Sequence, residues 1–305
     1  MENQARISTF FYSAFFILLY GSGYVGAKLG FPYAKPLVFL CWRFAISGIL
    51  LILIAFLTKA TWPKRPIDVL HISVSGIFLV SLFSIGTWVS MDMGVPPATS
   101  ALIIALQPLT VSFVAYFIFK KEINVNQWIG LFLGLLGVML VVGEHASFNT
   151  KYLIGVLMSF LGLLGLTVGN LYQKTFCSSM NIFTGGAIQS MVAGLVCLVL
   201  TFFFEPFVVQ WNGQFIFSLF WMSVVVSIGA ISFLYILIRR GESHKVASLF
   251  YLIPAITAII AYFVFHSTLN TMQIIGMFIT MLGVALVNIK FKFLSFFHSK
   301  KITYH

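Results

Sequence analysis

The sequence predicts an all-α integral membrane protein with ten transmembrane helices, arranged as two five-helix repeats of opposite orientation. Three observations support this fold class. Hydrophobic residues make up 60% of the 305 residues and charged residues only 8%, and long apolar runs recur along the whole chain. Runs of about 20 apolar residues are long enough to cross a hydrocarbon core of about 30 Å. The chain also resembles itself at a fixed offset, and each half contains an odd number of apolar runs.

The internal repeat is clearest in a segment that occurs twice, 146 residues apart. Without a gap, 14 of the 28 residues at 115–142 are identical to their partners at 261–288. The same offset places Pro108 on Pro254 and Arg43 on Gln189. Shared hydrophobicity alone would not supply this identity, so we infer an internal duplication with halves at residues 8–143 and 152–290.

Short connections with turn or charge signals divide each half into five apolar spans. The first half contains spans at residues 9–28, 36–58, 67–91, 98–119 and 125–143, and the second at residues 152–174, 182–204, 215–238, 246–265 and 271–290. No connection is long or polar enough to form a separate soluble domain. The signals between spans include Gly30, Pro32, Pro63, Pro66, Pro96, Pro97, Pro206 and Gly241.

The positions of the basic residues predict the orientation in the membrane. If the N-terminus is cytoplasmic, that side receives 14 Lys and Arg residues, the opposite side receives three, and Arg43 lies within a span. This bias predicts an inner or plasma membrane protein with both termini in the cytoplasm. Because five is an odd number, the second half must run through the membrane upside down. Inverted repeats of this kind are typical of secondary transporters, whose midplane site opens alternately to each side.

Composition and motifs also exclude several classes of function. The net charge of +11 comes from short loops between spans, where Lys and Arg favour an anionic lipid bilayer, so we expect no nucleic-acid partner. Cys41, Cys177 and Cys197 have neither CxxC spacing nor paired histidines, so no metal site or disulfide framework is expected. Phosphate-binding loops and nucleophile motifs are absent from the sequence, so we expect no cofactor and no enzyme.

Taken together, the chain resembles the drug/metabolite transporter superfamily, with two EamA-type halves. This resemblance implies a ten-helix transporter, but it does not specify the substrate, because the family is similar to carriers of amino acids, other metabolites, nucleotide sugars and phosphorylated sugars. The sequence departs from the family pattern at Thr268, which is the second-half counterpart of Glu122. The residues that carry the resemblance are Gly21, Ser22, Gly23, Pro36, Arg43, Pro97, Ala98, Gln107, Pro108, Lys121, Glu122, Gly130, Gly137, Gly241, Ala247, Ser248, Pro254, Gly276 and Gly283.

Arg43 is the principal candidate for substrate binding. It lies roughly 10 Å deep in the second span at 1.5 Å per residue, where a charge costs about 2.5–3.5 kcal/mol on insertion scales. Such a residue faces the protein interior or a wet cavity, although an arginine can also snorkel to the interface. Its counterpart Gln189 is also polar, which favours the cavity.

Aromatic and polar residues in other spans complete the expected site. Tyrosine and tryptophan near helix ends often form interface belts, but Trp88 and Tyr235 align between the halves if one residue is gapped. Pro108 and Pro254 each remove a backbone hydrogen bond at equivalent positions, which predicts two bends that are either hinges or purely structural kinks. The remaining expected substrate-binding residues are Tyr20, Tyr24, Gln107, Asn170 and Tyr251.

The glycines of the fifth and tenth spans predict close helix packing. This packing could lie within one bundle or between two copies in a homodimer, and the sequence leaves both open. The residues concerned are Gly130, Gly134, Gly137, Gly276 and Gly283.

These observations favour a secondary transporter that moves small polar metabolites outward or in exchange, with amino acids or related compounds as the expected substrates. A nucleotide-sugar or phosphorylated-metabolite antiporter is the alternative within transport, but its anionic substrate would need several deep cations. An intramembrane lipid-modifying enzyme would need a polar catalytic cluster at membrane depth, and a simple channel would not need the inverted repeat.

Overall fold

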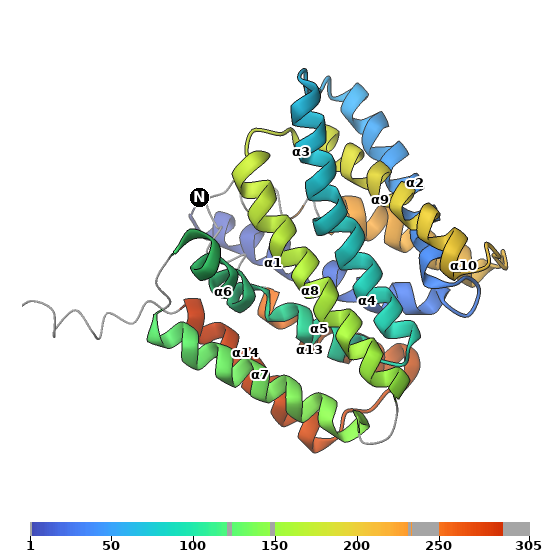
Figure 1. Ribbon diagram of the computed structural model, residues 1–305. Coiled ribbons are helices and arrows are strands. Elements are labelled where there is room, and N and C mark those ends of the chain that lie inside the picture. Colours follow the sequence, from blue (N-terminus) through green and yellow to red (C-terminus); the bar gives the residue numbers. More distant parts are fainter. Residues whose placement is uncertain (1, 121–123, 147–149, 231–232, 234–249, 289–305) are drawn as a thin grey trace, which may run out of the picture.

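The computed structural model describes residues 2–120, 124–146, 150–230, 233 and 250–288 (Figure 1). These residues form a helical bundle, and the described part contains no strand beyond an isolated bridge between Ala34 and Val209. Six helices are long and apolar enough to cross a membrane, and three shorter apolar helices accompany them. Together with the 29-residue α1, they account for the ten expected spans. The predicted fold class is therefore confirmed.

The first half contains two continuous spans, two interrupted spans and a final continuous span. Proline occupies the first turn at Pro36, Pro66 and Pro97, where its fixed φ suits a helix and its missing N–H is not needed. In chain order the elements are α1 (Glu2–Gly30), α2 (Pro36–Leu57), α3 (Pro66–Gly76), η1 (Ile77–Leu82), α4 (Phe83–Asp92), α5 (Pro97–Ala105), α6 (Gln107–Phe119) and α7 (Val125–Ala146).

The second half repeats this order of continuous and interrupted spans. Its described elements are α8 (Thr150–Phe176), α9 (Ile182–Phe204), α10 (Gly213–Phe220), η2 (Trp221–Ala230), η3 (Phe250–Leu252), α13 (Ile253–Phe265) and α14 (Thr271–Asn288). Several residues named from the sequence lie outside the described residues: Tyr235, Lys121, Glu122, Arg239, Arg240, Gly241, Lys245, Ala247, Ser248 and the C-terminal lysines.

Helices of one half pack against helices of the other in matching pairs. α2 packs against α9, α5 against α13, and α7 against α14, so equivalent spans meet across the bundle. α1 packs against η2 and α13, and its counterpart α8 packs in the same way against η1 and α6. These contacts between the halves are exchanged counterparts of one another. This is the pattern of two inverted repeats related by a pseudo-twofold axis.

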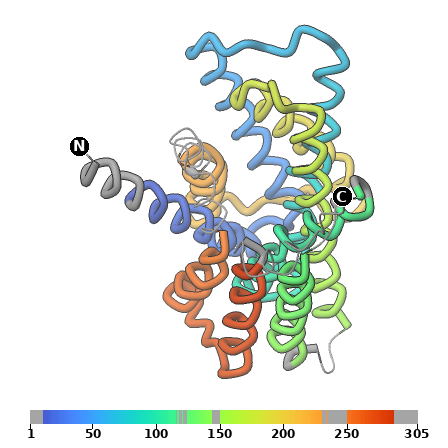
Figure 2. Tube along the Cα trace, turned by 90° about the vertical axis from the view of Figure 1, so that its left-hand side faces the viewer, coloured from blue at the N-terminus to red at the C-terminus, as the bar shows by residue number. Residues whose placement is uncertain are grey.

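The fifth and tenth spans, α7 and α14, run side by side (Figures 1 and 2). A Cβ atom added to Gly137 would lie 2.4 Å from the Gly276 carbonyl oxygen, and one added to Gly283 would lie 2.7 Å from the Gly130 carbonyl oxygen. Only glycine permits backbones to approach this closely. These glycines therefore pack two helices of a single chain, and the homodimer stays a prediction.

Candidate functional site

Arg43 lies on α2 in contact with two aromatic rings. Its guanidinium carbon is 4.7 Å from the ring centroid of Trp88 on α4 and 5.2 Å from that of Phe44. Tyr20 on α1 is close enough to interact with it electrostatically. Among the described residues, no carboxylate lies within ion-pair distance of Arg43, and its buried Nε has no hydrogen-bond partner. The guanidinium therefore retains unused donors beside an aromatic surface.

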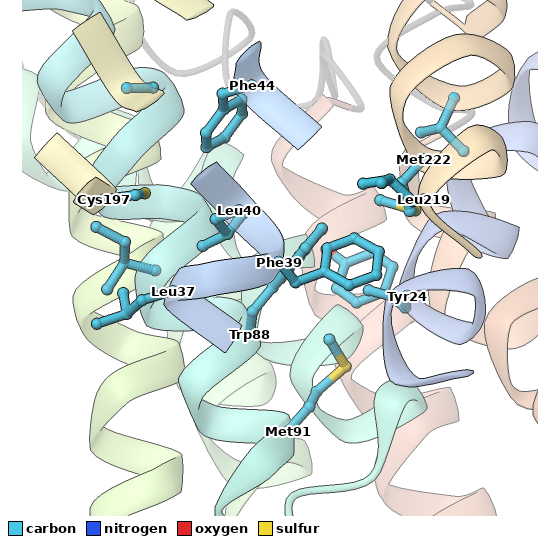
Figure 3. Close-up of a cluster of buried hydrophobic side chains, with 14 of the residues drawn as sticks. Tyr24, Leu37, Phe39, Leu40, Phe44, Trp88, Met91, Cys197, Leu219 and Met222 are labelled. Carbon is cyan, nitrogen blue, oxygen red and sulfur yellow. The ribbon is translucent and has the colours of Figure 1, made fainter. Parts of the chain in front are cut away.

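The aromatic surface beside Arg43 is part of a large buried cluster (Figure 3). The Trp88 ring centroid is 5.2 Å from that of Phe39, and both side chains are buried. Tyr24 on α1 belongs to the same cluster, and the Tyr20 ring packs against Phe250 with centroids 5.5 Å apart. Four expected site residues, Tyr20, Tyr24, Arg43 and Trp88, are thus brought together by the first three spans.

Gln189 belongs to a different group of contacts. Its buried amide nitrogen donates hydrogen bonds of 2.7 Å to Ser75 Oγ on α3 and to Gln173 Oε1 on α8. Asn170 lies one helical turn before Gln173 on α8 and is partly buried. Although Gln189 is the sequence counterpart of Arg43, the contacts of the two residues share no partner, and whether both face one cavity stays a prediction.

The two candidate hinges coincide with interruptions of their helices. α5 ends at Ala105 and α6 begins at Gln107, directly before Pro108, while the short 3₁₀ turn η3 precedes α13 and Pro254. The residues at the two breaks, Leu106 and Leu252, are exact counterparts at the offset of 146. The fourth span is thus interrupted directly before Pro108, and the described part of the ninth span begins with a 3₁₀ turn before Pro254, while a role of these positions in gating stays a prediction.

The other expected ligands lie near these breaks. Gln107 is partly buried at the start of α6, and its backbone oxygen accepts a hydrogen bond from Thr110. Tyr251 is buried in a second apolar cluster, around Leu102, Leu106 and Met277, and not in the cluster that contains Trp88. The structure therefore does not bring Tyr251 to Arg43, and Tyr235 lies outside the described residues.

Matching π-helical segments interrupt the third span of each half, and the sequence did not predict them. η1 and η2 overlap when the halves are superposed at the offset of 146. Ser81 Oγ donates to the Gly76 carbonyl, and its counterpart Ser227 donates to the Met222 carbonyl, each five residues back. π-Helical turns inside longer helices are frequent at functional sites. The alignment of Ser81 with Ser227 in the repeat is the sequence feature that could have indicated these π-helical segments.

The bundle has two ends with different packing. We call the end that contains Lys35, Asp92 and Glu205 the Glu205 face. Here the backbone N–H of Gln210 donates a hydrogen bond of 2.9 Å to the Tyr33 carbonyl, next to the bridge between Ala34 and Val209. Lys35 Nζ lies 3.4 Å from Asp92 Oδ2. The Gln210–Tyr33 hydrogen bond and the Ala34–Val209 bridge join the loop after α1 to the loop after α9, so the two halves meet at this end.

The opposite end, which we call the Asn181 face, contains a pocket of about 410 Å³. The equivalent loops line it: one follows α2 and includes Trp62 and Lys64, and the other follows α8 and includes Cys177 and Asn181. Burial raises the pKa of the Cys177 thiol. Equivalent loops thus meet at the Glu205 face and line the pocket at the Asn181 face, where Thr184 Oγ1 on α9 also donates a hydrogen bond of 3.0 Å to the Thr61 carbonyl in the loop after α2.

Glu205 lies next to the turn signal Pro206, and the sequence alone did not single it out as a functional residue. Its Oε2 accepts hydrogen bonds from the backbone N–H groups of Leu37 (2.9 Å) and Val38 (3.3 Å) at the start of α2. Burial raises the pKa of the Glu205 carboxyl, although these two hydrogen bonds oppose the shift. No group of three His, Cys, Asp or Glu side chains suited to a metal ion occurs in the described part of the chain.

Comparison with known proteins gives a consistent result for family and fold. The model of the EamA-like transporter family matches residues 7–143 and again residues 148–289. A crystal structure of a protein with 16% identity superposes with a TM-score of 0.64, covering 92% of this chain and 97% of the other. At this identity the superposition supports the fold alone.

The curated relatives are named as transporters. The chain is 27% identical over 304 residues to the uncharacterized transporter YvbV of Bacillus subtilis, covering 96% of this chain and 95% of that protein. It is 24% identical over 276 residues to the uncharacterized inner membrane transporter YedA of Escherichia coli, covering 89% and 88%. It is also 20% identical over 285 residues to the probable amino-acid metabolite efflux pump of Escherichia coli, covering 88% and 90%.

Proposed function

Since the chain belongs to the EamA-like transporter family, we propose that it exports a small carboxylate-bearing metabolite, an amino acid or a related compound, by alternating access. One observation carries the substrate class. Arg43 is a membrane-embedded guanidinium with unused hydrogen-bond donors and no acidic partner among the described residues. Arginine binds carboxylates through two parallel hydrogen bonds, and a carboxylate would compensate the buried charge.

The aromatic rings beside Arg43 suit a small organic acid. Trp88 packs on the guanidinium and leaves its in-plane donors available. Binding sites for small molecules combine an apolar lining with a few placed polar groups. The relative named as an efflux pump for amino-acid metabolites supports the same class of substrate.

The two ends of the bundle support alternating access. We assign the Glu205 face to the outside and the Asn181 face to the cytoplasm, following the distribution of Lys and Arg. With this assignment the structure corresponds to a state that is closed outside and has a pocket on the inside. Rocking of the inverted halves would exchange the two arrangements, because their loops are equivalent.

An antiporter of nucleotide sugars or phosphorylated metabolites is the rival proposal. A phosphorylated substrate carries more negative charge than a single guanidinium can compensate. Transport of purified protein in liposomes separates the two, using radiolabelled amino acids and sugar phosphates with and without a pH gradient. We expect counterflow of an amino acid that depends on Arg43, whereas counterflow of sugar phosphates alone would reject the proposal.

A further inference from the structure

The N-termini of α2 and α9 are equivalent in the two repeats but are capped in different ways. The N–H groups of Phe183 and Thr184 in α9 are bound by the side chain of the preceding Asn181, at 2.9 and 3.4 Å. Their counterparts at the offset of 146 are the N–H groups of Leu37 and Val38 in α2. The residue equivalent to Asn181 is Lys35, which makes no capping hydrogen bond.

Glu205 supplies the missing cap from the other half of the protein. It follows α9 directly, and it binds two N–H groups that lie 168 and 167 residues earlier in the chain. The first turn of a helix carries unpaired N–H groups and partial positive charge, so a carboxylate at this position is favourable. One cap is therefore neutral and local, and the other is acidic and joins the two repeats.

We propose that Glu205 is a gating residue, which holds the outer side closed by capping α2 across the boundary between the halves. Opening of this side must separate the loop after α9 from the start of α2, and so it must break both hydrogen bonds. α2 also carries Arg43 less than two turns further along. Glu205 therefore controls access to the helix that contains the proposed anchor, and this inference rests on the proposed transport by alternating access.

Two native cysteines report the state of the two ends. Cys41 is buried on α2, one turn beyond the capped N–H groups, and Cys177 is buried in the pocket at the Asn181 face. Each can be kept as the single cysteine by changing the other two to serine. A charged, membrane-impermeant maleimide is then applied to whole cells and to inside-out vesicles, so that each end is labelled separately. This assay needs no substrate, so its outcome is independent of which metabolite is carried.

Glu205→Ala should increase the rate of Cys41 labelling from outside about tenfold and lower that of Cys177 from inside, since two amides lose their acceptor. Glu205→Gln keeps an oxygen at the same reach and should stay close to the parent protein, whereas the shorter Glu205→Asp should behave like alanine. The matched control is Asn181→Ala, which removes the equivalent cap within one repeat and should not increase Cys41 labelling.

The proposal would be overturned if Cys41 were labelled at the same rate in Glu205→Ala and Glu205→Asp as in the parent protein, with both variants present at normal levels in the membrane. An equal increase in Asn181→Ala would overturn it as well, because that result would indicate general loosening. If Glu205→Ala does not accumulate in the membrane, the comparison of Glu205→Asp with Glu205→Gln decides the question, with equal labelling of these two variants counting against a gate.

Discussion

At the scale of single residues, partly buried charge is the informative feature. Arg43 is held within a membrane span by packing on Trp88, with no acidic partner among the described residues. An arginine that only snorkels would place its guanidinium at the interface, whereas this one contacts rings of α2 and α4. Glu205 sits in a partly buried position at the end of α9, where two backbone amides compensate its charge. In both residues, removing the charge from water costs free energy, and a specific contact offsets part of that cost: the Trp88 ring for Arg43 and two backbone N–H groups for Glu205.

The first prediction concerns Arg43. Arg43→Lys keeps the charge but loses the planar fork, so it should weaken transport and leave residual activity. Arg43→Gln should raise the half-saturating substrate concentration roughly ten- to a hundredfold, since a charged hydrogen-bonding partner is lost. Gln189→Ala should cost less than Arg43→Gln. Uptake into liposomes at matched protein levels measures all three, and equal activity of the two Arg43 variants and the parent would remove Arg43 from the site.

A second prediction concerns pH at Glu205. Burial raises its carboxyl pKa in the closed state, and opening exposes it to water, so protonation favours the closed state. The closed state should gain stability as the outside pH falls through this raised pKa, and the gain is complete below the ordinary range of glutamate, about 4.3. The charged or titratable groups nearby are Lys35, Asp92, Cys41 and Cys197.

The check is the rate of Cys41 labelling in the parent protein divided by the rate in Glu205→Gln at each pH. This ratio removes the part of the thiol titration that the two proteins share, and the same ratio for a small permeant maleimide accounts for the direct effect of the Glu205 charge on the Cys41 thiol. We expect the ratio to fall as the outside is acidified, because only the parent protein can bind the proton. A ratio that is independent of pH would show that Glu205 does not titrate between the two states.

At the scale of elements, the breaks in the helices follow the repeat. The fourth and ninth spans are interrupted at Leu106 and Leu252, and the third and eighth contain π-helical turns at equivalent positions. Each interruption leaves backbone groups without their usual helical partners, so less free energy is needed to bend the helix there. Because the interruptions occur in equivalent spans of two inverted halves, they would let one half bend near one end of the bundle and the other half bend in the same way near the opposite end.

The third prediction follows for the proline pair. Pro108→Ala with Pro254→Ala should leave an inserted protein with reduced turnover, because the restored N–H groups can straighten helices that must bend. Pro97→Ala is the matched control, because α5 begins at this proline after a loop, whereas Pro108 directly follows the helical segment α5 and Pro254 follows the 3₁₀ turn η3. Counterflow rates measure the effect, and near-parental rates in the double variant would make both prolines purely structural.

At the scale of the whole molecule, the pseudo-twofold relation explains why the two ends can alternate. Equivalent pairs of loops are joined by backbone hydrogen bonds at the Glu205 face and line a pocket at the Asn181 face, where Thr184 also donates to the Thr61 carbonyl. In the proposed alternating access, rocking of the halves would exchange these two arrangements. The acidic cap at only one end makes the ends unequal, so their relative stability can be adjusted by a single residue.

The fourth prediction tests the orientation of the molecule. A cysteine placed at Pro96, in the loop after α4, should react with an impermeant reagent from outside the cell. A cysteine placed at Lys64, in the loop after α2, should react only after permeabilisation, because the excess of Lys and Arg retains that side in the cytoplasm. The reverse pattern would invert the topology and assign the pocket to the outside.

Much of the architecture was determined by the sequence alone, because the signals for it are local or periodic. Apolar runs of membrane-spanning length predicted the ten helices, and the offset of 146 residues predicted the duplication. The breaks at Pro108 and Pro254 follow from a missing N–H group, which any proline entails. Arg43 was identified as a candidate because a charge within a span is costly wherever it lies.

Tertiary structure alone decided which of these residues meet. No periodicity relates Glu205 to Leu37 or Arg43 to Trp88, since each pair is joined only when different spans pack together. The same packing gives Gln189 and Arg43 different partners, although the repeat aligns them. Sequence similarity between the halves therefore predicts equivalent environments, while contact between particular side chains depends on how the halves are packed.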